Sequence, residues 1–160
     1  MVELDHIEKH FGEVEALASL SLTIEHGERV AILGPSGSGK TTLLLLMCGQ
    51  LQATSGRVLM NGTDLVQMRA GRELARLVGM IHQQFDLVPQ LSAMHNVLAG
   101  RLGVWGLTKA MVSLLWPLEQ RSALAALARV GVSDRAYLHA GRLSGGEQQR
   151  VAIARLLMQN

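Results

Sequence analysis

A glycine-rich segment between an apolar run and a leucine-rich run constrains this 160-residue chain most strongly. Residues 34–41 read Gly-Pro-Ser-Gly-Ser-Gly-Lys-Thr, which fits the spacing G-x-x-x-x-G-K-[ST]. Residues 29–33 are nearly all apolar and predict a short buried strand, whereas residues 40–50 predict a helix. Glycines let backbone N–H groups turn inward and approach phosphate oxygens closely. The segment therefore predicts a strand, a phosphate-binding loop and a helix in an α/β core.

Three side chains at the end of this loop have the chemistry that a nucleotide site needs. Lys40 is placed to bridge the β- and γ-phosphates, and the Thr41 hydroxyl is placed to coordinate Mg²⁺. Thr42 is placed to contact the α-phosphate, and the following helix adds its positive end. A Gly/Ser-rich connection with an unrelated lysine is the competing interpretation, so a second, independent motif is needed.

That second motif is Leu-Ser-Gly-Gly-Glu-Gln-Gln-Arg at residues 143–150. Ser144 with Glu147 three residues later predicts a capping box at the start of an amphipathic helix. A capping box does not explain Gly145 and Gly146, since each glycine costs about 1 kcal/mol of helix propensity relative to alanine. Glycines in a first helical turn are expected where backbone amides must closely approach an anion.

The rest of the chain divides into a strand-rich part and a helical part. Strands are predicted at residues 2–7, 20–24, 57–60 and 77–81, with a tight turn at Asn61-Gly62. From residue 92 onward the pattern is helical, over residues 92–102, 119–130 and 144–158. This order predicts a helical lobe inserted into an α/β core.

Composition excludes several classes of protein. Apolar residues make up 48% of the chain but aromatic residues only 3%, so the core is expected to consist mainly of Leu, Ala, Val and Ile. No apolar run approaches the length of a membrane span, and the N-terminus has no leader pattern, so a cytosolic chain is expected. The single cysteine, Cys48, excludes an internal disulfide. The net charge of +2 comes from scattered arginines, and nucleic acid is therefore not expected as a partner.

Together, GPSGSGKT and LSGGEQQRVAIAR resemble the Walker A and signature motifs of ATP-binding-cassette (ABC) transporter subunits. The resemblance covers essentially the whole chain, including a glutamine loop at residues 79–83 and an aromatic residue in His10-Phe11-Gly12. It implies an α/β P-loop NTPase core with an N-terminal antiparallel β-subdomain and an inserted α-helical subdomain, incomplete at the C-terminus. The implied boundaries are 1–84 for the β-subdomain and Walker A part, 85–142 for the helical subdomain and 143–160 for the signature helix.

The resemblance also assigns site residues for ATP and Mg²⁺. Phe11 matches the aromatic residue that stacks on adenine, and Gln83 matches the catalytic glutamine that reaches Mg²⁺ and the attacking water. Thr41 and Gln83 are the implied Mg²⁺ ligands. His82 and His95 depart from the family pattern, and we interpret them as variation because neither has a suitably spaced second metal ligand. The other implied nucleotide contacts are Gly34, Pro35, Ser36, Gly37, Ser38, Gly39, Lys40, Thr41, Thr42, Ser144, Gly145, Gly146 and Gln148.

In this family two ATP-binding subunits face head to tail, so that each signature helix closes on ATP held by its partner. The resemblance implies two transmembrane permease subunits and a solute-binding protein as further partners, at the cytoplasmic face of the bacterial inner membrane. Residues 97–103, 105–117, 127–132 and 134–137 resemble those of phosphonate importers, whereas Glu147 departs from the glutamine expected there. Amino acid import and lipoprotein release therefore remain alternative systems.

The resemblance places an apolar strand ending in Asp-Glu, a D-loop and a switch histidine after residue 160. Residues 1–160 do not contain this Walker B glutamate or that histidine. Hydrolysis by this stretch alone is therefore expected to be negligible, and a non-hydrolysing ATP-binding fragment is an alternative function. A soluble cassette ATPase of DNA repair or translation is disfavoured by the short spacing between motifs and the absence of a coiled-coil insertion.

Overall fold

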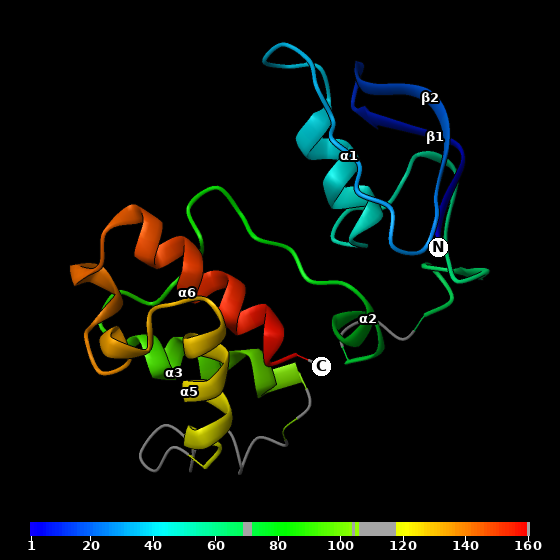
Figure 1. Cartoon of the computed structure of the whole chain (residues 1–160). Coiled ribbons are helices and arrows are strands. Elements are labelled where there is room, and N and C mark those ends of the chain that lie inside the picture. The colour runs from blue at the N-terminus through cyan, green and yellow to red at the C-terminus, as the bar shows by residue number, and fades with distance from the viewer. Residues whose placement is uncertain (69–71, 104, 106–117, 160) are drawn as a thin grey trace. The chain divides into compact units, whose positions relative to one another are not determined.

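The computed structural model describes residues 1–68, 72–103, 105 and 118–159. The chain forms two compact units, Met1–Leu74 and Ala75–Asn160 (Figure 1). Within the described ranges, no helix is long and apolar enough to cross a membrane. The finer boundaries expected from the family resemblance, at residues 84/85 and 142/143, remain a prediction.

The first unit is built on a four-stranded antiparallel sheet in the order β2-β1-β3-β4. Its strands are β1 (Val2–Phe11), β2 (Val14–Ile24), β3 (Ser55–Met60) and β4 (Thr63–Asp64). Asn61 and Gly62 connect β3 to β4 with φ angles of 50° and 79°, as a type I′ hairpin turn requires. The predicted antiparallel β-subdomain and its Asn-Gly turn are confirmed.

A β-bulge in β1 allows two apolar residues three positions apart to enter the same core. Leu4 and Ile7 are both almost fully buried, although strict alternation would place them on opposite faces. The pairing register shifts between them, and His6 has a φ of 46°. Gly56 lies across from this bulge, where a Cβ atom would overlap with the carbonyl oxygen of His6. The extra residue therefore realigns the strand, and glycine makes room for it.

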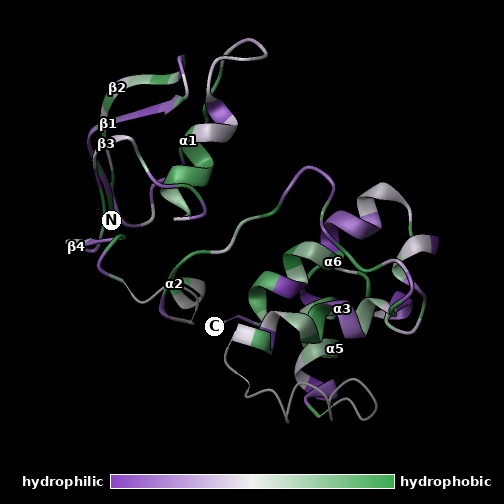
Figure 2. Cartoon of the chain, turned by 180° about the vertical axis from the view of Figure 1, so that it is seen from behind, coloured by the Kyte–Doolittle hydropathy of each residue, from purple (hydrophilic) through white to green (hydrophobic). Residues whose placement is uncertain are grey.

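Helix α1 (Lys40–Met47) packs against the core of the first unit with Leu43 and Leu46. Both side chains are buried and belong to one cluster with Leu4, Ile7 and Val58. Figure 2 shows the hydrophobic colouring that runs along α1. The predicted leucine-rich helix after the glycine loop is thus confirmed, and its core contacts fix the helix that follows the loop.

Two predicted strands are wrong. Residues 29–33 and 77–81 do not form strands, and among the described residues only β1 to β4 join the sheet. Residues 29–33 run as irregular chain, with Val30 half exposed and Leu33 91% exposed. Helix α2 (Arg72–Leu77) precedes irregular residues 78–81. A strand requires a hydrogen-bonding neighbour, and an apolar run predicts burial without supplying that neighbour.

The second unit is helical, as predicted. Its elements are α3 (Ala93–Leu98), the 3₁₀ helices η1 (Ala99–Gly103), η2 (Ser133–Arg135) and η3 (Ala140–Arg142), α5 (Gln120–Arg129) and α6 (Gly145–Leu157). The helix predicted at residues 92–102 becomes η1 from Ala99, where a Cβ at Gly100 would overlap with the carbonyl oxygen of Arg155. Of the insertion at residues 105–117, only residue 105 is described.

Helices α3, α5 and α6 pack against one another around a core of aliphatic residues. Val97, Leu127 and Val151 are fully buried, and alanines such as Ala123 and Ala154 let the helices approach. This is the Leu, Ala and Val core that the low aromatic content predicts. Trp105 is buried at its edge and donates a hydrogen bond from Nε1 to Glu119 Oε1 at 3.2 Å.

Candidate functional site: a phosphate-binding loop and a capped signature helix

The phosphate loop, residues 34–41, enters α1 through glycines in the left-handed region. Gly37 and Gly39 both have φ of 83°, and Gly39 is the N-cap of α1. A Cβ atom at Gly39 would lie 2.6 Å from the backbone oxygen of Ala16 in β2, whereas a Cβ at Gly37 would meet nothing within 4 Å. Gly39 is therefore required both by its backbone angle and by its contact with the sheet.

The N-terminus of α1 is not capped by any side chain among the described residues. Gly39 has none to offer, and the first turn of α1 contains no acidic residue. The first amides of a helix have no partner within the helix and lie at the positive end of its dipole. A phosphate group fits both properties, because its oxygens accept hydrogen bonds from these amides and its charge is attracted to the helix end.

Lys40 folds back over the loop that precedes it. Its Nζ donates hydrogen bonds to the carbonyl oxygens of Gly34 at 3.0 Å and Pro35 at 2.6 Å, and to Ser38 Oγ at 3.3 Å. These acceptors are neutral, and anionic phosphate oxygens form stronger hydrogen bonds with an ammonium group. Lys40 thus holds the loop in shape and keeps its charge where phosphate is expected. Thr41 is exposed and Thr42 half buried on the first turn of α1.

Phe11 lies in the same unit as this loop, at the end of β1, and its side chain is 52% exposed. The Nζ atom of Lys9 lies 5.0 Å from the centroid of the Phe11 ring and donates a hydrogen bond to the Gln52 carbonyl oxygen at 2.9 Å. An exposed ring supported by a cation is chemically suited to stacking. The adenine-stacking role of Phe11 remains a prediction.

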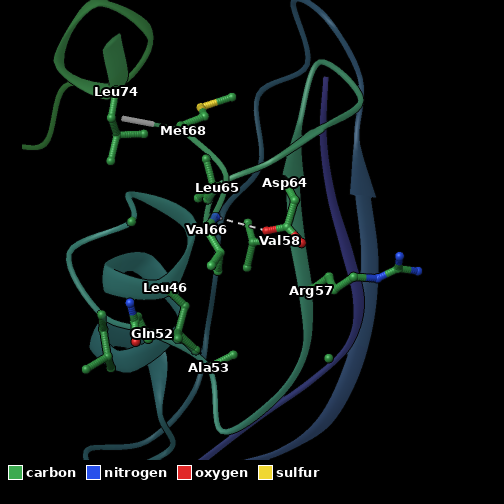
Figure 3. A pocket seen from close by; sticks show the side chains of 13 residues that line it. Leu46, Gln52, Ala53, Arg57, Val58, Asp64, Leu65, Val66, Met68 and Leu74 are labelled. Atoms are coloured by element: carbon green, nitrogen blue, oxygen red, sulfur yellow. Dashed lines mark hydrogen bonds between the residues drawn. The ribbon is translucent and has the colours of Figure 1, made fainter. Parts of the chain in front are cut away.

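A cavity of about 210 Å³ lies elsewhere in the first unit and does not include the phosphate loop. Figure 3 shows Leu46, Val58 and Leu65 around it, with the Arg57 side chain extending away from them. Arg57 is engaged with Asp5 through a hydrogen bond of 2.8 Å to Oδ2. The cavity is lined by aliphatic side chains together with Gln52, Arg57 and Asp64, and it lies apart from the lysine and the helix N-terminus of the phosphate loop.

In the second unit, Ser144 and Glu147 form the predicted capping box at the start of α6. Ser144 Oγ accepts the Glu147 amide at 3.4 Å, and Glu147 Oε2 accepts both the amide and the hydroxyl of Ser144 at 2.8 Å. The other carboxylate oxygen accepts a hydrogen bond of 3.0 Å from Arg135 Nε. The Ser144 backbone and hydroxyl donors, followed by the Arg135 guanidinium, lower the pKa of Glu147 to about 2.

The two glycines of the signature motif leave the first turn of α6 open. A Cβ at Gly145 would meet nothing within 4 Å, and one at Gly146 would meet only an Arg150 guanidinium nitrogen at 3.7 Å. Gln148 has an unforeseen structural use, since its Nε2 donates to the carbonyl oxygens of Ala140 at 3.0 Å and Leu143 at 3.2 Å. The nucleotide contacts expected of Ser144, Gly145, Gly146 and Gln148 remain predictions.

Gln83 is exposed in a turn in which the Phe85 amide donates to the His82 carbonyl oxygen at 2.9 Å. The two histidines that depart from the family pattern have local partners. His82 Nε2 lies 3.6 Å from Asp86 Oδ2, and His95 Nδ1 lies 2.7 Å from Ser92 Oγ. Within the part of the chain that the structure describes, no group of three or more His, Cys, Asp or Glu side chains could hold a metal ion.

Two residues next to Gln83 escape sequence analysis. Arg155 on α6 and Asn96 on α3 both bind the backbone that follows Gln83. The one usable signal is that Asn96 belongs to a mostly apolar helix, in which a buried amide is expected to be hydrogen-bonded. The structure therefore places the predicted site residues in two sets, residues 11 and 34–42 in the first unit and residues 83 and 144–148 in the second.

Comparison with known proteins identifies the family that uses this pair of motifs. The model of the ABC transporter family matches residues 17–160. The chain belongs to the ABC transporter family. Among curated relatives, the phosphonates import ATP-binding protein PhnC of Pseudomonas putida is 45% identical over 150 residues, which cover 92% of this chain and 56% of that protein. PhnC of Frankia casuarinae is 46% identical over 162 residues, which cover 99% of this chain and 63% of the relative.

Solved structures of ABC cassettes share its fold. A dimeric bacterial ABC transporter cassette matches 100% of this chain with a TM-score of 0.81 at 32% identity, over 70% of its own length. A nucleotide-free cassette matches 100% of this chain with a TM-score of 0.84 at 28% identity, over 65% of its length. The chain spans somewhat more than half the length of these two PhnC relatives. An incomplete ABC ATPase fold is therefore confirmed.

Proposed function

We propose that this chain is the nucleotide-binding part of an ABC importer subunit that couples ATP binding and hydrolysis to uptake of phosphonate or a related solute. The observation that carries the proposal is the N-terminus of α1, which has no side-chain cap in the described structure and has Lys40 folded over its loop. The solute class is supported by the PhnC relatives, which are named for phosphonates import.

The residues of the first unit bind and orient the nucleotide. Backbone amides of residues 36–41 donate to the phosphate oxygens, and Lys40 exchanges its loop carbonyls for the β- and γ-phosphates. Phe11 supports the adenine ring. Gly39 keeps the loop close to β2, because no side chain stands between them. This set fits a nucleoside triphosphate better than a single free phosphate, since its donors extend along several residues.

Thr41 in the first unit and Gln83 in the second are proposed as ligands of the magnesium ion that accompanies ATP, as the family resemblance implies. Thr41 presents an exposed hydroxyl on α1, and Gln83 presents an exposed amide. Oxygen ligands of this kind suit Mg²⁺, which would neutralise charge on the phosphates. Gln83 would also orient the attacking water. Activation of that water belongs to a carboxylate that the family places after residue 160, so turnover is proposed for the whole protein.

Partners follow from the signature helix. Gly145 and Gly146 leave the first turn of α6 open, and Ser144 lies at its end. We infer that this turn closes on ATP held by a second ATP-binding subunit in a head-to-tail dimer, as supported by the dimeric assembly named for a cassette of the same fold. Two permease subunits and a solute-binding protein complete the system at the cytoplasmic face of the inner membrane.

The experiment is uptake and ATPase measurement on the assembled transporter. Lys40→Ala is expected to abolish ATP-dependent phosphonate uptake and to reduce ATPase turnover by roughly 100-fold or more, because charge-assisted bonds to phosphate are lost. Arg129→Gln on α5, an exposed residue outside the site, is the matched control for loss of one positive charge. Unchanged turnover in Lys40→Ala would contradict the proposal.

The same assay separates the alternatives. ATP binding without turnover in the wild-type assembly would favour the non-hydrolysing function instead. Normal ATPase activity that is coupled to another solute, such as an amino acid, would keep the ABC importer function and replace the phosphonate assignment.

A further inference from the structure

Arg155, in the last turn of α6, forms hydrogen bonds with the backbone that follows Gln83. Arg155 donates from one terminal nitrogen to the carbonyl oxygen of Asp86 at 2.7 Å and from the other to the carbonyl oxygen of Phe85 at 2.9 Å. These acceptors belong to consecutive residues about 70 positions away in the sequence. A planar guanidinium group with fixed donor directions can hold two such oxygens at once.

The residues held by Arg155 have an unfavourable backbone conformation. Phe85 has a φ of 60° and Asp86 has a φ of 47°. Residues other than glycine rarely adopt such positive φ angles. Such conformations persist only where the surrounding structure maintains them. The two hydrogen bonds from Arg155 to the carbonyl oxygens of Phe85 and Asp86 are contacts from α6 that help to maintain this backbone conformation.

The same segment is also held by α3. The amide of Val88 donates to Asn96 Oδ1 at 2.7 Å, and Asn96 Nδ2 donates to the Val88 carbonyl oxygen at 3.0 Å. Asn96 is 1% exposed, so its amide is shielded from water and these bonds are partly buried. Residues 85–88 are therefore fixed by two helices, while Gln83, two positions before Phe85, is exposed.

We propose that Arg155 is a positioning residue that sets the orientation of Gln83 through the backbone of Phe85 and Asp86. Helix α6 has 13 residues and so extends about 20 Å, with Ser144 at one end and Arg155 in its last turn. The helix that carries the signature motif thus also holds the segment after Gln83, which lies between α2 and α3. The consequence for turnover rests on the proposed function, whereas the positioning of residues 85 and 86 does not.

Lysine cannot replace arginine in this role. A lysine ammonium has the same charge but no planar pair of donors with fixed separation. Arg155→Lys therefore keeps the positive charge and removes the planar pair of donors. Arg155→Gln removes the charge and the pair of donors, and Arg129→Gln on the exposed face of α5 is the control for loss of charge in the same unit.

The first test is amide hydrogen exchange by NMR, on the whole protein without nucleotide. The Phe85 amide, which is bonded to His82, is expected to exchange about tenfold faster in both Arg155 variants. The Val88 amide, which is held by Asn96, is expected to change by less than about twofold. Unchanged exchange at Phe85, or wild-type exchange in Arg155→Lys, would overturn the proposal.

The second test is ATP turnover by the assembled transporter. Both Arg155 variants are expected to lose about tenfold in kcat with an unchanged KM for ATP, since the phosphate loop is untouched. A rise in KM alone, or full rescue by lysine, would contradict a positioning role. Failure of the wild type to bind ATP would refute the proposed function and leave the exchange result as it stands.

Discussion

The two helices that begin with glycine-rich motifs are started in opposite ways. The N-cap of α1 is Gly39, which has a left-handed backbone and no side chain to cap the helix. The N-cap of α6 is Ser144, whose hydroxyl and amide form a closed capping box with Glu147. The first end is shaped by backbone conformation and the second by side-chain hydrogen bonds.

This difference indicates what each end still requires. The amides at the start of α1 need external acceptors, so this end is suited to hold phosphate by itself. The start of α6 already has an internal acceptor in Ser144 and a carboxylate in Glu147. It is thus a stable helix end that can meet a phosphate held elsewhere. Substitutions should accordingly affect the first unit through glycines and the second through polar side chains.

The largest effect is expected from Gly39→Ala. Left-handed backbone costs a residue with a Cβ about 1–2 kcal/mol. The overlap with Ala16 adds roughly 1–3 kcal/mol. We expect chemical denaturation to show a first unit destabilised by about 2–5 kcal/mol, and calorimetry to show no ATP binding.

Gly27→Ala is the matched control, because Gly27 has a φ of 78° but a Cβ there would meet nothing within 4 Å. It should lower stability by only about 1–2 kcal/mol and leave ATP affinity unchanged. Equal effects of the two alanines would show that the contact between Gly39 and β2 is unimportant.

A smaller effect, confined to the second unit, is expected from Asn96→Leu. The substitution removes the acceptor of the partly buried Val88 amide and the donor shared by the carbonyl oxygens of Val88, Leu91 and Ser92. We expect a loss of about 1–3 kcal/mol in urea denaturation, because these partly buried backbone groups lose their hydrogen-bond partner. Arg121→Leu, at an exposed position of α5, should change stability by less than about 0.5 kcal/mol. Similar losses in both variants would contradict the specific role of the amide.

Ser144→Ala tests the side-chain cap itself. Loss of an N-cap hydroxyl typically lowers stability by about 1 kcal/mol, and the second unit should show this in thermal unfolding. Thr41→Ala on the first turn of α1 removes a hydroxyl from a helix that has no side-chain cap. It should leave stability unchanged or slightly higher, since alanine is the better helix former. A loss at Thr41 as large as that at Ser144 would break the comparison between the two helix ends.

The smallest effect is the pH dependence contributed by Glu147, because its ion-pair partner Arg135 is exposed and solvent screens the pair. Its pKa falls from an ordinary 4.5 to about 2 on folding. This contribution is thus fully present above about pH 4.5 and is lost as the pH falls toward 2. Glu147→Gln keeps the capping-box pattern but removes the charge.

Stability measured between pH 7 and pH 3 should therefore fall less steeply in Glu147→Gln than in the wild type. Other carboxylates titrate in both proteins, so the difference between the two curves reports on Glu147 alone. Parallel curves would show that the hydrogen bonds of ionised Glu147 with Ser144 and Arg135 do not contribute to the stability of the fold.

Local chemistry explains which features the sequence could predict. Ser144 and Glu147 are three residues apart, and Asn61-Gly62 is a two-residue turn, so each motif contains its own partners. The strand predicted at residues 29–33 is wrong because an apolar run does not specify a neighbouring strand. The role of Arg155 cannot be predicted, because its acceptors lie 69 and 70 residues away and nothing in the sequence near α6 points to Phe85 and Asp86.

The most direct test of the account is a titration of magnesium-bound ATP into the protein, followed by heat and by backbone amide NMR shifts. Saturable binding is expected, with the largest shifts at the amides of residues 36–41, and both signals should disappear in Lys40→Ala. A well-folded wild-type protein that gives no heat and no shifts at these amides would contradict the assignment of α1 as the phosphate-binding helix.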